Sequence, residues 1–482
     1  MFSADSATVS SSSRTPDPAR RRGLARLAAS AVASGLVMTG AFIGAGSAVA
    51  DEAPQHQGGA AAVLDGLKTF DRAVLHTNGR NQQLPAGVFE MTVDGGGKLK
   101  TYCIDIHNPT QDQAKYLETP WDQTSLGANK NAGKIRWILE HSYPKVDDLA
   151  ALAQEARTGP LTEKTAAAGT QVAIWRYSDN ADVEATDEAA EKLADWLEKN
   201  AVAQAEPKAS LTLDPAAVSG RSGERLGPIT VHTNAGQVSV TPPADSASGV
   251  KITDKGGQPL AGASNGTQLY FDVPEGAADG SASLTVQATT SVPVGRAFAS
   301  ATKSQTMILA GSSDSTVSAT ATATWAKKGA IPAVSAQKNC AKGGVDVTAS
   351  NQGDEPFTFQ LAGKEHTVEA GKSETVTVPV AEDQAYDITV TGPGGFSKTF
   401  KGVLDCKTSG SGNGGGGLDT QTEDQPVPAT SGGGSTGAAG DLAETGGSSA
   451  TPVIAGVAIA LVAVGGGAVF FLRKRKAQPS AQ

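Results

Sequence analysis

The chain has 482 residues, a formal net charge of −9 at pH 7, 39% hydrophobic residues, 57 glycines and 24 prolines. This length allows roughly two to four domains that each bury a core of their own. The acidic balance disfavours nucleic acid as a partner, and the composition favours extracellular β-rich modules over a large cytosolic enzyme.

Residues 1–50 have the pattern of a secretory signal peptide. Four arginines between 20 and 26 precede a run of small apolar residues from Leu27 to Val49. The sequence Ala-Val-Ala before Asp51 fits a small-x-small cleavage site. We expect this segment to be removed on export, by the general secretory route or the twin-arginine route.

Residues 51–204 combine predicted strands with predicted helices. The segments 88–93 and 99–105 flank a glycine-rich turn, which predicts two strands and places Cys103 within or at the end of the second. Helical patterns follow at 134–141, 149–157, 165–177 and from an N-cap at Thr186 onward. The region is therefore predicted to be an α+β domain.

Two β-rich regions come next. Residues 205–330 contain short β-branched or alternating runs separated by turn residues, which predicts an antiparallel sandwich of immunoglobulin type. Residues 331–407 have the same pattern in a smaller unit, for which we expect a second Ig-like β-sandwich module. Cys340 and Cys406 bracket this unit, and in an exported protein they predict a disulfide that closes it.

The C-terminal part has a different composition. Residues 408–441 are rich in Gly, Ser and Pro and cannot build a core, so they predict a disordered stalk. An apolar run at 452–472 is long enough to span a bilayer as a helix, and the basic cluster that follows would keep that end inside. Before the apolar run stands a pentapeptide, Leu442, Ala443, Glu444, Thr445 and Gly446.

This order of pentapeptide, apolar span and basic tail resembles the sorting signal of sortase substrates in Gram-positive bacteria, in the Leu-Ala-x-Thr-Gly variant common among actinobacteria. The resemblance implies that a sortase transpeptidase cuts between Thr445 and Gly446 and joins the Thr445 carboxyl to an amine of peptidoglycan. Residues 442–482 would then hold the protein in the membrane only before sorting, and the mature protein would be anchored to the cell wall. An ordinary single-span membrane protein is the alternative interpretation.

Cys103 is left without a disulfide partner once the two distal cysteines pair, and an odd cysteine in an exported protein suggests a chemical role. The six histidines show no metal-ligand spacing, and the sequence has no zinc-protease, hydrolase-elbow or phosphate-loop motif. We therefore expect neither a metal nor a cofactor.

The sequence at residues 102–105 (Tyr-Cys-Ile-Asp) and 170–173 (Thr-Gln-Val-Ala) resembles the thioester domains of Gram-positive surface proteins. In that family a Thr-Gln-x-Ala motif and an upstream cysteine supply the halves of an internal thioester. The resemblance implies that residues 51–204 are a thioester domain in which Cys103 and Gln171 are cross-linked. The residues implied to support this bond are Tyr102, Asp105, Thr170 and Ala173.

Such a bond has a clear chemical use, because a thioester is far more reactive toward amines than the amide from which it formed. The sequence therefore predicts a wall-anchored adhesin that attaches covalently to an amine-bearing surface ligand. Because capture uses the bond once, we do not expect an enzyme. A second interpretation is a secreted transglutaminase-like or cysteine-protease-like enzyme with Cys103 as nucleophile and His107 or His141 as base. A noncovalent surface binding protein is the third.

Overall fold

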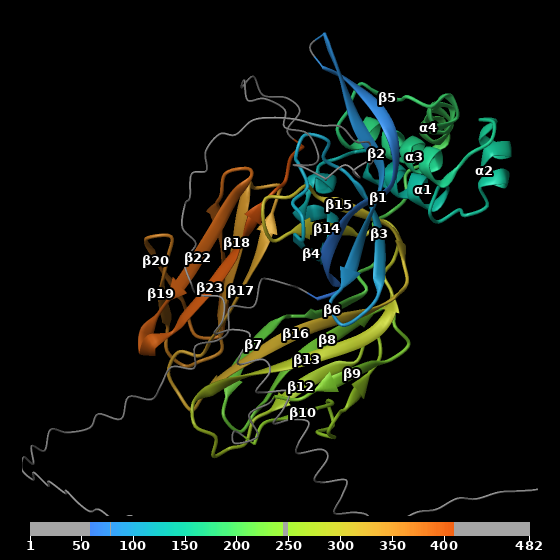
Figure 1. Ribbon diagram of the computed structural model, residues 1–482. Helices are drawn as coiled ribbons and strands as arrows, with labels where there is room; N and C mark the ends of the chain where they lie inside the picture. The colour runs from blue at the N-terminus through green and yellow to red at the C-terminus, as the bar shows by residue number, and fades with distance from the viewer. Residues whose placement is uncertain (1–57, 78, 244–248, 409–482) are drawn as a thin grey trace, which may run out of the picture. The chain divides into compact units, whose positions relative to one another are not determined.

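The computed structural model describes residues 58–77, 79–243 and 249–408 (Figure 1). The predicted signal peptide, the stalk beyond Thr408 and the sorting signal at 442–482 lie outside these residues. Within the described part of the chain, no helix is both long and apolar enough to cross a membrane. The predicted span at 452–472 lies outside the described residues.

The first domain is built on a seven-stranded sheet with the order β2-β3-β15-β14-β4-β1-β5. Five of its strands come from the N-terminal region, namely β1 (Ala61–Thr77), β2 (Arg80–Val93), β3 (Lys98–Cys103), β4 (Lys115–Thr119) and β5 (Val183–Ala185). The other two, β14 (Ala297–Ser300) and β15 (Met307–Ser312), come from the segment predicted to form a separate sandwich. The structure thus differs from the predicted boundary between residues 204 and 205.

The composition of β15 explains why it belongs in the middle of this sheet. Residues 307–310 (Met-Ile-Leu-Ala) are all fully buried, so this strand is apolar on both faces, as a central strand must be when both faces are covered. It pairs antiparallel with β3, where Met307 lies opposite Cys103. The sheet therefore brings residues far apart in the sequence next to the predicted reactive cysteine.

Four helices complete the first domain, and they lie together beside β1, β2 and β5 in Figure 1. They are α1 (Ala132–Glu140), α2 (Leu149–Ala156), α3 (Glu163–Ser178) and α4 (Glu188–Asn200). They confirm the predicted helices to within a few residues, except that Asp187 rather than Thr186 caps α4, because the Asp187 carboxylate accepts from the backbone N–H groups of Ala189 and Ala190.

Helix α3 is the central helix of the domain, since every residue from 166 to 175 is buried. A capping box between Thr162 and Thr165 fixes its start. Gly169 lets it approach α4 closely, because a Cβ at this position would collide with the carbonyl oxygen of Ala190. The motif at 170–173 is thereby held in the core.

The middle domain has a four-stranded sheet, β10-β12-β8-β6, and a five-stranded sheet, β11-β9-β13-β16-β7. Its strands are β6 (Leu211–Asp214), β7 (Ala217–Arg221), β8 (Arg225–Thr233), β9 (Val238–Thr241), β10 (Lys251–Thr253), β11 (Gly262–Ala263), β12 (Gln268–Asp272), β13 (Gly280–Ser291) and β16 (Asp314–Ala326). All pair antiparallel except β7 with β16, which is parallel. The expected β-rich region is present, and its immunoglobulin type stays a prediction.

One long pairing connects the middle domain to the first. Strands β13 and β16 pair over their whole length, from Gly280 opposite Trp325 to Ser291 opposite Asp314. The segment 292–313 between them contains β14 and β15 and enters the sheet of the first domain. The middle domain thus contributes two strands to its neighbour.

The third domain has a three-stranded sheet, β17-β18-β21, and a four-stranded sheet, β20-β19-β22-β23, around a separate hydrophobic core. Its strands are β17 (Pro332–Asn339), β18 (Gly344–Asn351), β19 (Phe357–Leu361), β20 (Lys364–Val368), β21 (Lys372–Pro379), β22 (Gln384–Thr391) and β23 (Ser397–Leu404). Cys340 and Cys406 form a disulfide, as predicted.

Candidate functional site

The predicted reactive cysteine lies at the end of β3 and is fully buried. Two hydrogen bonds hold its backbone to α3, because the Cys103 N–H donates to Gln171 Oε1 at 3.0 Å and Gln171 Nε2 donates to the Cys103 carbonyl at 2.8 Å. The structure therefore brings the two predicted residues together. Both polar atoms of the Gln171 side chain are, however, engaged with the backbone of Cys103.

The sulfur of Cys103 contacts a different glutamine. Its Sγ lies against the side-chain Oε1 of Gln305, a fully buried residue two positions before β15. The Gln305 Nε2 atom is also buried and has no hydrogen-bond partner among the described residues. An amide whose oxygen touches a thiol, and whose NH₂ group has no hydrogen-bond partner among the described residues, is an acyl donor that the thiol can attack.

The backbone around Gln305 is firmly fixed. Its N–H donates to the Pro109 carbonyl at 3.2 Å, and the Tyr116 hydroxyl donates to its carbonyl at 2.9 Å. The same hydroxyl also lies 2.7 Å from Ser304 Oγ, and Ile104 N donates to the Thr306 carbonyl at 3.1 Å. Bonds on both sides of Gln305 thus orient its side chain toward Cys103.

Sequence reasoning missed Gln305 because it lies in a segment assigned to a separate domain. The available signal was its position two residues before an apolar run at 307–310, which indicates a buried strand. A polar amide at the entrance of such a strand needs a buried partner.

Burial controls the acidity of the groups around the sulfur. It raises the pKa of the Cys103 thiol well above its usual value, and the nearby carboxyls of Asp179 and Asp105 act in the same direction. The Trp175 side chain opposes them by interacting with the thiol. The thiol is therefore held neutral until it reacts.

Asp105 and Asp179 form a buried acidic pair beside the sulfur. Burial raises the pKa of Asp105 to about 7, and the Asp405 carboxyl contributes. Burial and Asp105 raise the pKa of Asp179 well above its usual value. Asp179 accepts from Ile106 N at 3.2 Å, and Asp105 accepts from His107 N at 3.2 Å. These bonds shape the loop that follows Cys103.

The remaining predicted motif residues are buried and structural in their contacts. The Tyr102 hydroxyl donates to the Tyr143 carbonyl at 2.7 Å, and the Thr170 hydroxyl donates to the Ala166 carbonyl within α3 at 2.8 Å. Ala173 is fully buried in the same helix. The predicted cleavage site at 442–446 lies outside the described residues.

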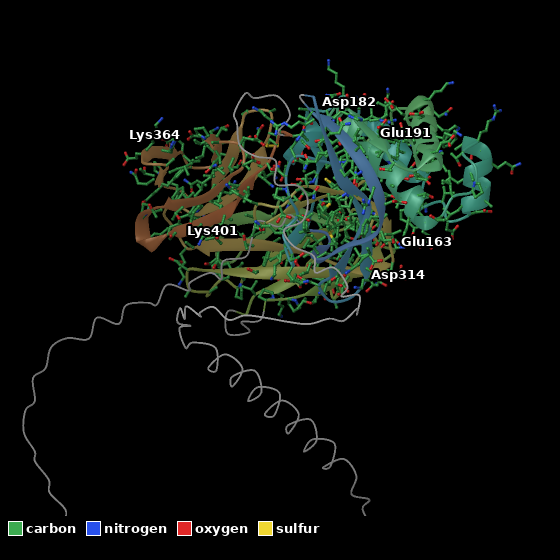
Figure 2. The ribbon with its side chains drawn as sticks, turned by 45° about the horizontal axis from the view of Figure 1, so that its top comes forward. Glu163, Asp182, Glu191, Asp314, Lys364 and Lys401 are labelled. Carbon is green, nitrogen blue, oxygen red and sulfur yellow. A yellow bond between two sulfur atoms is a disulfide. The ribbon has the colours of Figure 1, made fainter. Side chains whose placement is uncertain are left out.

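Of the two histidines considered as a base, His141 stacks on the Trp137 ring at 4.0 Å and its Nδ1 lies 2.8 Å from the Trp137 carbonyl. Trp137 thus holds both the ring face and one ring nitrogen of His141. His107 is half-buried, and burial lowers its pKa. Charged side chains such as Glu163, Asp182 and Lys364 lie on the outside of the molecule in Figure 2, unlike the buried site.

A hydrogen bond joins the third domain to the residue after Gln305, because Thr306 Oγ1 donates to Asp405 Oδ2 at 2.8 Å. Burial raises the pKa of Asp405 to about 6. Among the described residues, Glu382, Asp383 and Asp405 place carboxylate oxygens close enough to ligate a cation. Glu382 already accepts from the backbone N–H groups of Cys406 and Lys407, which orders these acids without an ion.

Two segments of the chain match known protein families. Residues 100–203 match the family of thioester domains, and residues 332–403 match the C-terminal domain of bacterial phospholipase C. None of the curated proteins matches the chain. The first matched segment contains Cys103 and Gln171 and ends before Gln305. The chain thus contains a thioester-domain segment followed by several β-sheet regions.

Two solved structures are similar to this chain at low identity. One is described as the Bacillus anthracis TIE protein, at 14% identity and a TM-score of 0.26, with 73% of this chain and 81% of that chain covered. The other is described as the thioester domain of an Enterococcus faecium TIE protein, at 16% identity and a TM-score of 0.25, with 56% and 97% covered.

Proposed function

We propose that this protein binds amine-bearing ligands covalently through an internal thioester between Cys103 and Gln305. The contact between the Cys103 sulfur and the Gln305 amide, whose NH₂ group has no partner, carries the proposal. The family match of residues 100–203 supports the same chemistry. Gln305 replaces the predicted Gln171 because both polar atoms of Gln171 are bonded to the Cys103 backbone.

The chemistry requires two acyl transfers. First, Sγ of Cys103 attacks Cδ of Gln305, the C–N bond breaks, and Nε2 leaves as ammonia with the proton of the thiol. Later, the nitrogen of a ligand amine attacks the same carbon, the C–S bond breaks, and the sulfur regains a proton from the amine. The result is an amide between Gln305 and the ligand, and a free Cys103.

Burial suits this use of the bond. Cys103, Gln171 and Gln305 have no solvent-exposed surface, so water has little access to the thioester before a ligand opens the site. The reaction consumes the thioester once, so we propose a single-use covalent binder rather than an enzyme.

The sequence signals support a location outside the cell for this binder. We propose that sortase joins Thr445 to peptidoglycan after export and that the region at 408–441 spans the wall, which makes the protein a surface adhesin. The order of pentapeptide, apolar span and basic tail supports this placement. The proposal requires a partner with a primary amine, such as a lysine side chain on another surface.

The deciding experiment is the intact mass of the purified ectodomain, residues 51–440, before and after incubation with methylamine. The expected mass is one ammonia below the value for the disulfide-bonded sequence, and methylamine should replace this deficit with one adduct on Gln305. An adduct on Gln171 would restore the original pairing. A full mass with no adduct would reject the thioester, and an assay for repeated turnover would then test the enzyme alternative.

A further inference from the structure

Trp175 presents an unsatisfied hydrogen-bond donor inside the core. The residue is fully buried in α3, and its indole Nε1–H makes no hydrogen bond of ordinary geometry within the described structure. Buried indole N–H groups elsewhere in the chain are satisfied, since Trp121 donates to the Gly295 carbonyl at 2.8 Å and Trp325 to the Ala278 carbonyl at 2.8 Å. A buried donor without an acceptor lowers the stability of the fold, so its presence suggests a function.

The position of Trp175 on α3 puts its side chain on the helix face that meets Cys103. Trp175 follows Gln171 by four residues, so the two side chains share one face of the helix. Gln171 bonds the backbone of Cys103 from that face. The indole N–H is the only polar group of the Trp175 side chain, and this side chain interacts with the Cys103 thiol.

We propose that the Trp175 indole N–H stabilises negative charge on the Cys103 sulfur during acyl transfer. This inference rests on the proposed thioester and adds a hydrogen-bond donor to its two reacting residues. Before the thioester forms the Cys103 thiol is neutral, and a neutral sulfur is only a weak acceptor, so the N–H makes no strong hydrogen bond in the structure.

Charge develops on the sulfur in both steps. When Sγ attacks Cδ of Gln305 it gives up its proton, and when the ligand amine later breaks the C–S bond the sulfur leaves as a thiolate before it is protonated. In each case a preformed N–H donor in a water-free site lowers the energy of the charged sulfur. The neighbouring carboxyls of Asp105 and Asp179 disfavour a negative charge on the sulfur, and the N–H donor opposes their effect.

The alternative is that Trp175 only fills space in the core. The substitution Trp175→Phe separates the two roles, because it removes the N–H and keeps an aromatic ring. A loosened core would expose the thioester and make it react faster with methylamine, whereas a lost donor makes it react more slowly. The two explanations therefore predict changes of opposite sign.

The experiment measures the rate at which methylamine adds to the thioester, by intact mass, in wild type and W175F. The matched control is W325F, which loses a satisfied indole bond in the middle domain. A second variant replaces Trp175 by benzothienylalanine, which has nearly the shape of tryptophan but carries sulfur in place of the N–H. This variant keeps the test decisive if W175F does not fold.

We expect both Trp175 variants to react with methylamine at least about tenfold more slowly than wild type. The rate of W325F should equal the wild-type rate. A smaller fraction of thioester in the purified Trp175 variants is expected for the same reason. Equal or faster reaction in a folded Trp175 variant would overturn the inference and leave the thioester intact. A wild-type protein without the ammonia deficit would instead reject the thioester itself, and the inference with it.

Discussion

Gln171 binds Cys103 at both of its backbone polar groups, as donor to the carbonyl and as acceptor from the N–H. A single side chain thereby fixes the end of β3 against α3 and sets the position of the sulfur. Because both amide atoms are used, the motif glutamine positions the cysteine, and a second glutamine is free to react.

The first prediction concerns this pair of bonds. Gln171→Ala leaves a buried N–H and a buried carbonyl of Cys103 without partners, which should lower the free energy of unfolding by about 2–4 kcal/mol. In the folded fraction, any methylamine adduct should still map to Gln305. Urea denaturation and peptide mapping check the two parts.

Gln287→Ala is the control, since this glutamine is exposed on β13 and its loss should change stability by no more than about 0.5 kcal/mol. If Gln171→Ala retained the ammonia deficit and wild-type stability, the positioning role would be refuted. If Gln171→Ala were as stable as wild type but formed no methylamine adduct, Gln171 rather than Gln305 would be the thioester residue.

The second prediction concerns a buried ion pair between β4 and the residue directly before β14. The Glu118 carboxylate accepts from Arg296 Nε at 3.0 Å and from the backbone N–H groups of Ala60 and Ser210 at 3.1 and 2.9 Å. The side chains of Glu118 and Arg296 are 0% and 4% exposed. Glu118→Ala leaves the buried N–H groups of Ala60 and Ser210 without an acceptor, while Arg296 keeps its ion pair with Glu206, so it should cost about 3 kcal/mol of unfolding free energy.

Glu188→Ala provides the comparison, because its ion pair with Lys192 lies on the surface of α4 and such pairs contribute little. Chemical denaturation of both variants checks the prediction. If Glu118→Ala lost as little unfolding free energy as Glu188→Ala, the bonds of Glu118 would not be what holds β4 to the segment before β14.

Local patterns in the sequence were enough to predict several parts of this structure. The strand that ends at Cys103 follows from its alternation beside a glycine turn, the helices follow from their apolar spacing, and the disulfide follows from two cysteines around a small core. Each of these features depends on neighbouring residues or on a closed unit. They required no knowledge of how distant strands pair.

The pairing of distant strands is what the sequence did not reveal. Strand β15 is carried into the first sheet by the long pairing of β13 with β16, and no local pattern states which sheet an apolar strand joins. Gln305 depends on that pairing for its place beside Cys103. The motif at Gln171 was recognisable because it lies on one helix, yet its hydrogen bonds depend on the same tertiary contact.

The third prediction concerns the pH dependence of stability. The pKa of Asp105 is raised by burial to about 7 in the folded protein, above its usual 3.8. At a pH between 3.8 and about 7, unfolding therefore releases a proton from Asp105. The free energy of unfolding falls as the pH rises over this range, and the contribution of Asp105 is lost above about 7. Relative to Asp105→Asn, wild type should lose on the order of 4 kcal/mol between pH 4 and pH 8.

Urea denaturation of both proteins at the two pH values measures this difference. Asp105→Asn keeps an acceptor for His107 N and cannot ionise, so it removes the titration with little change of shape. A stability difference between the two proteins that is independent of pH would show that the Asp105 carboxyl titrates normally in the fold.

The last prediction separates the third domain from the site. The disulfide joins residues 66 positions apart, and its removal in the double variant C340A/C406A should destabilise the third domain by about 4 kcal/mol in the chain-entropy model. Its core is separate from the one that contains Cys103, so the ammonia deficit should persist. Calorimetry and intact mass check the two parts. If the deficit disappeared, the bond from Thr306 to Asp405 would be needed to hold Gln305 in place, because it is the hydrogen bond that links the third domain to the residue next to that glutamine.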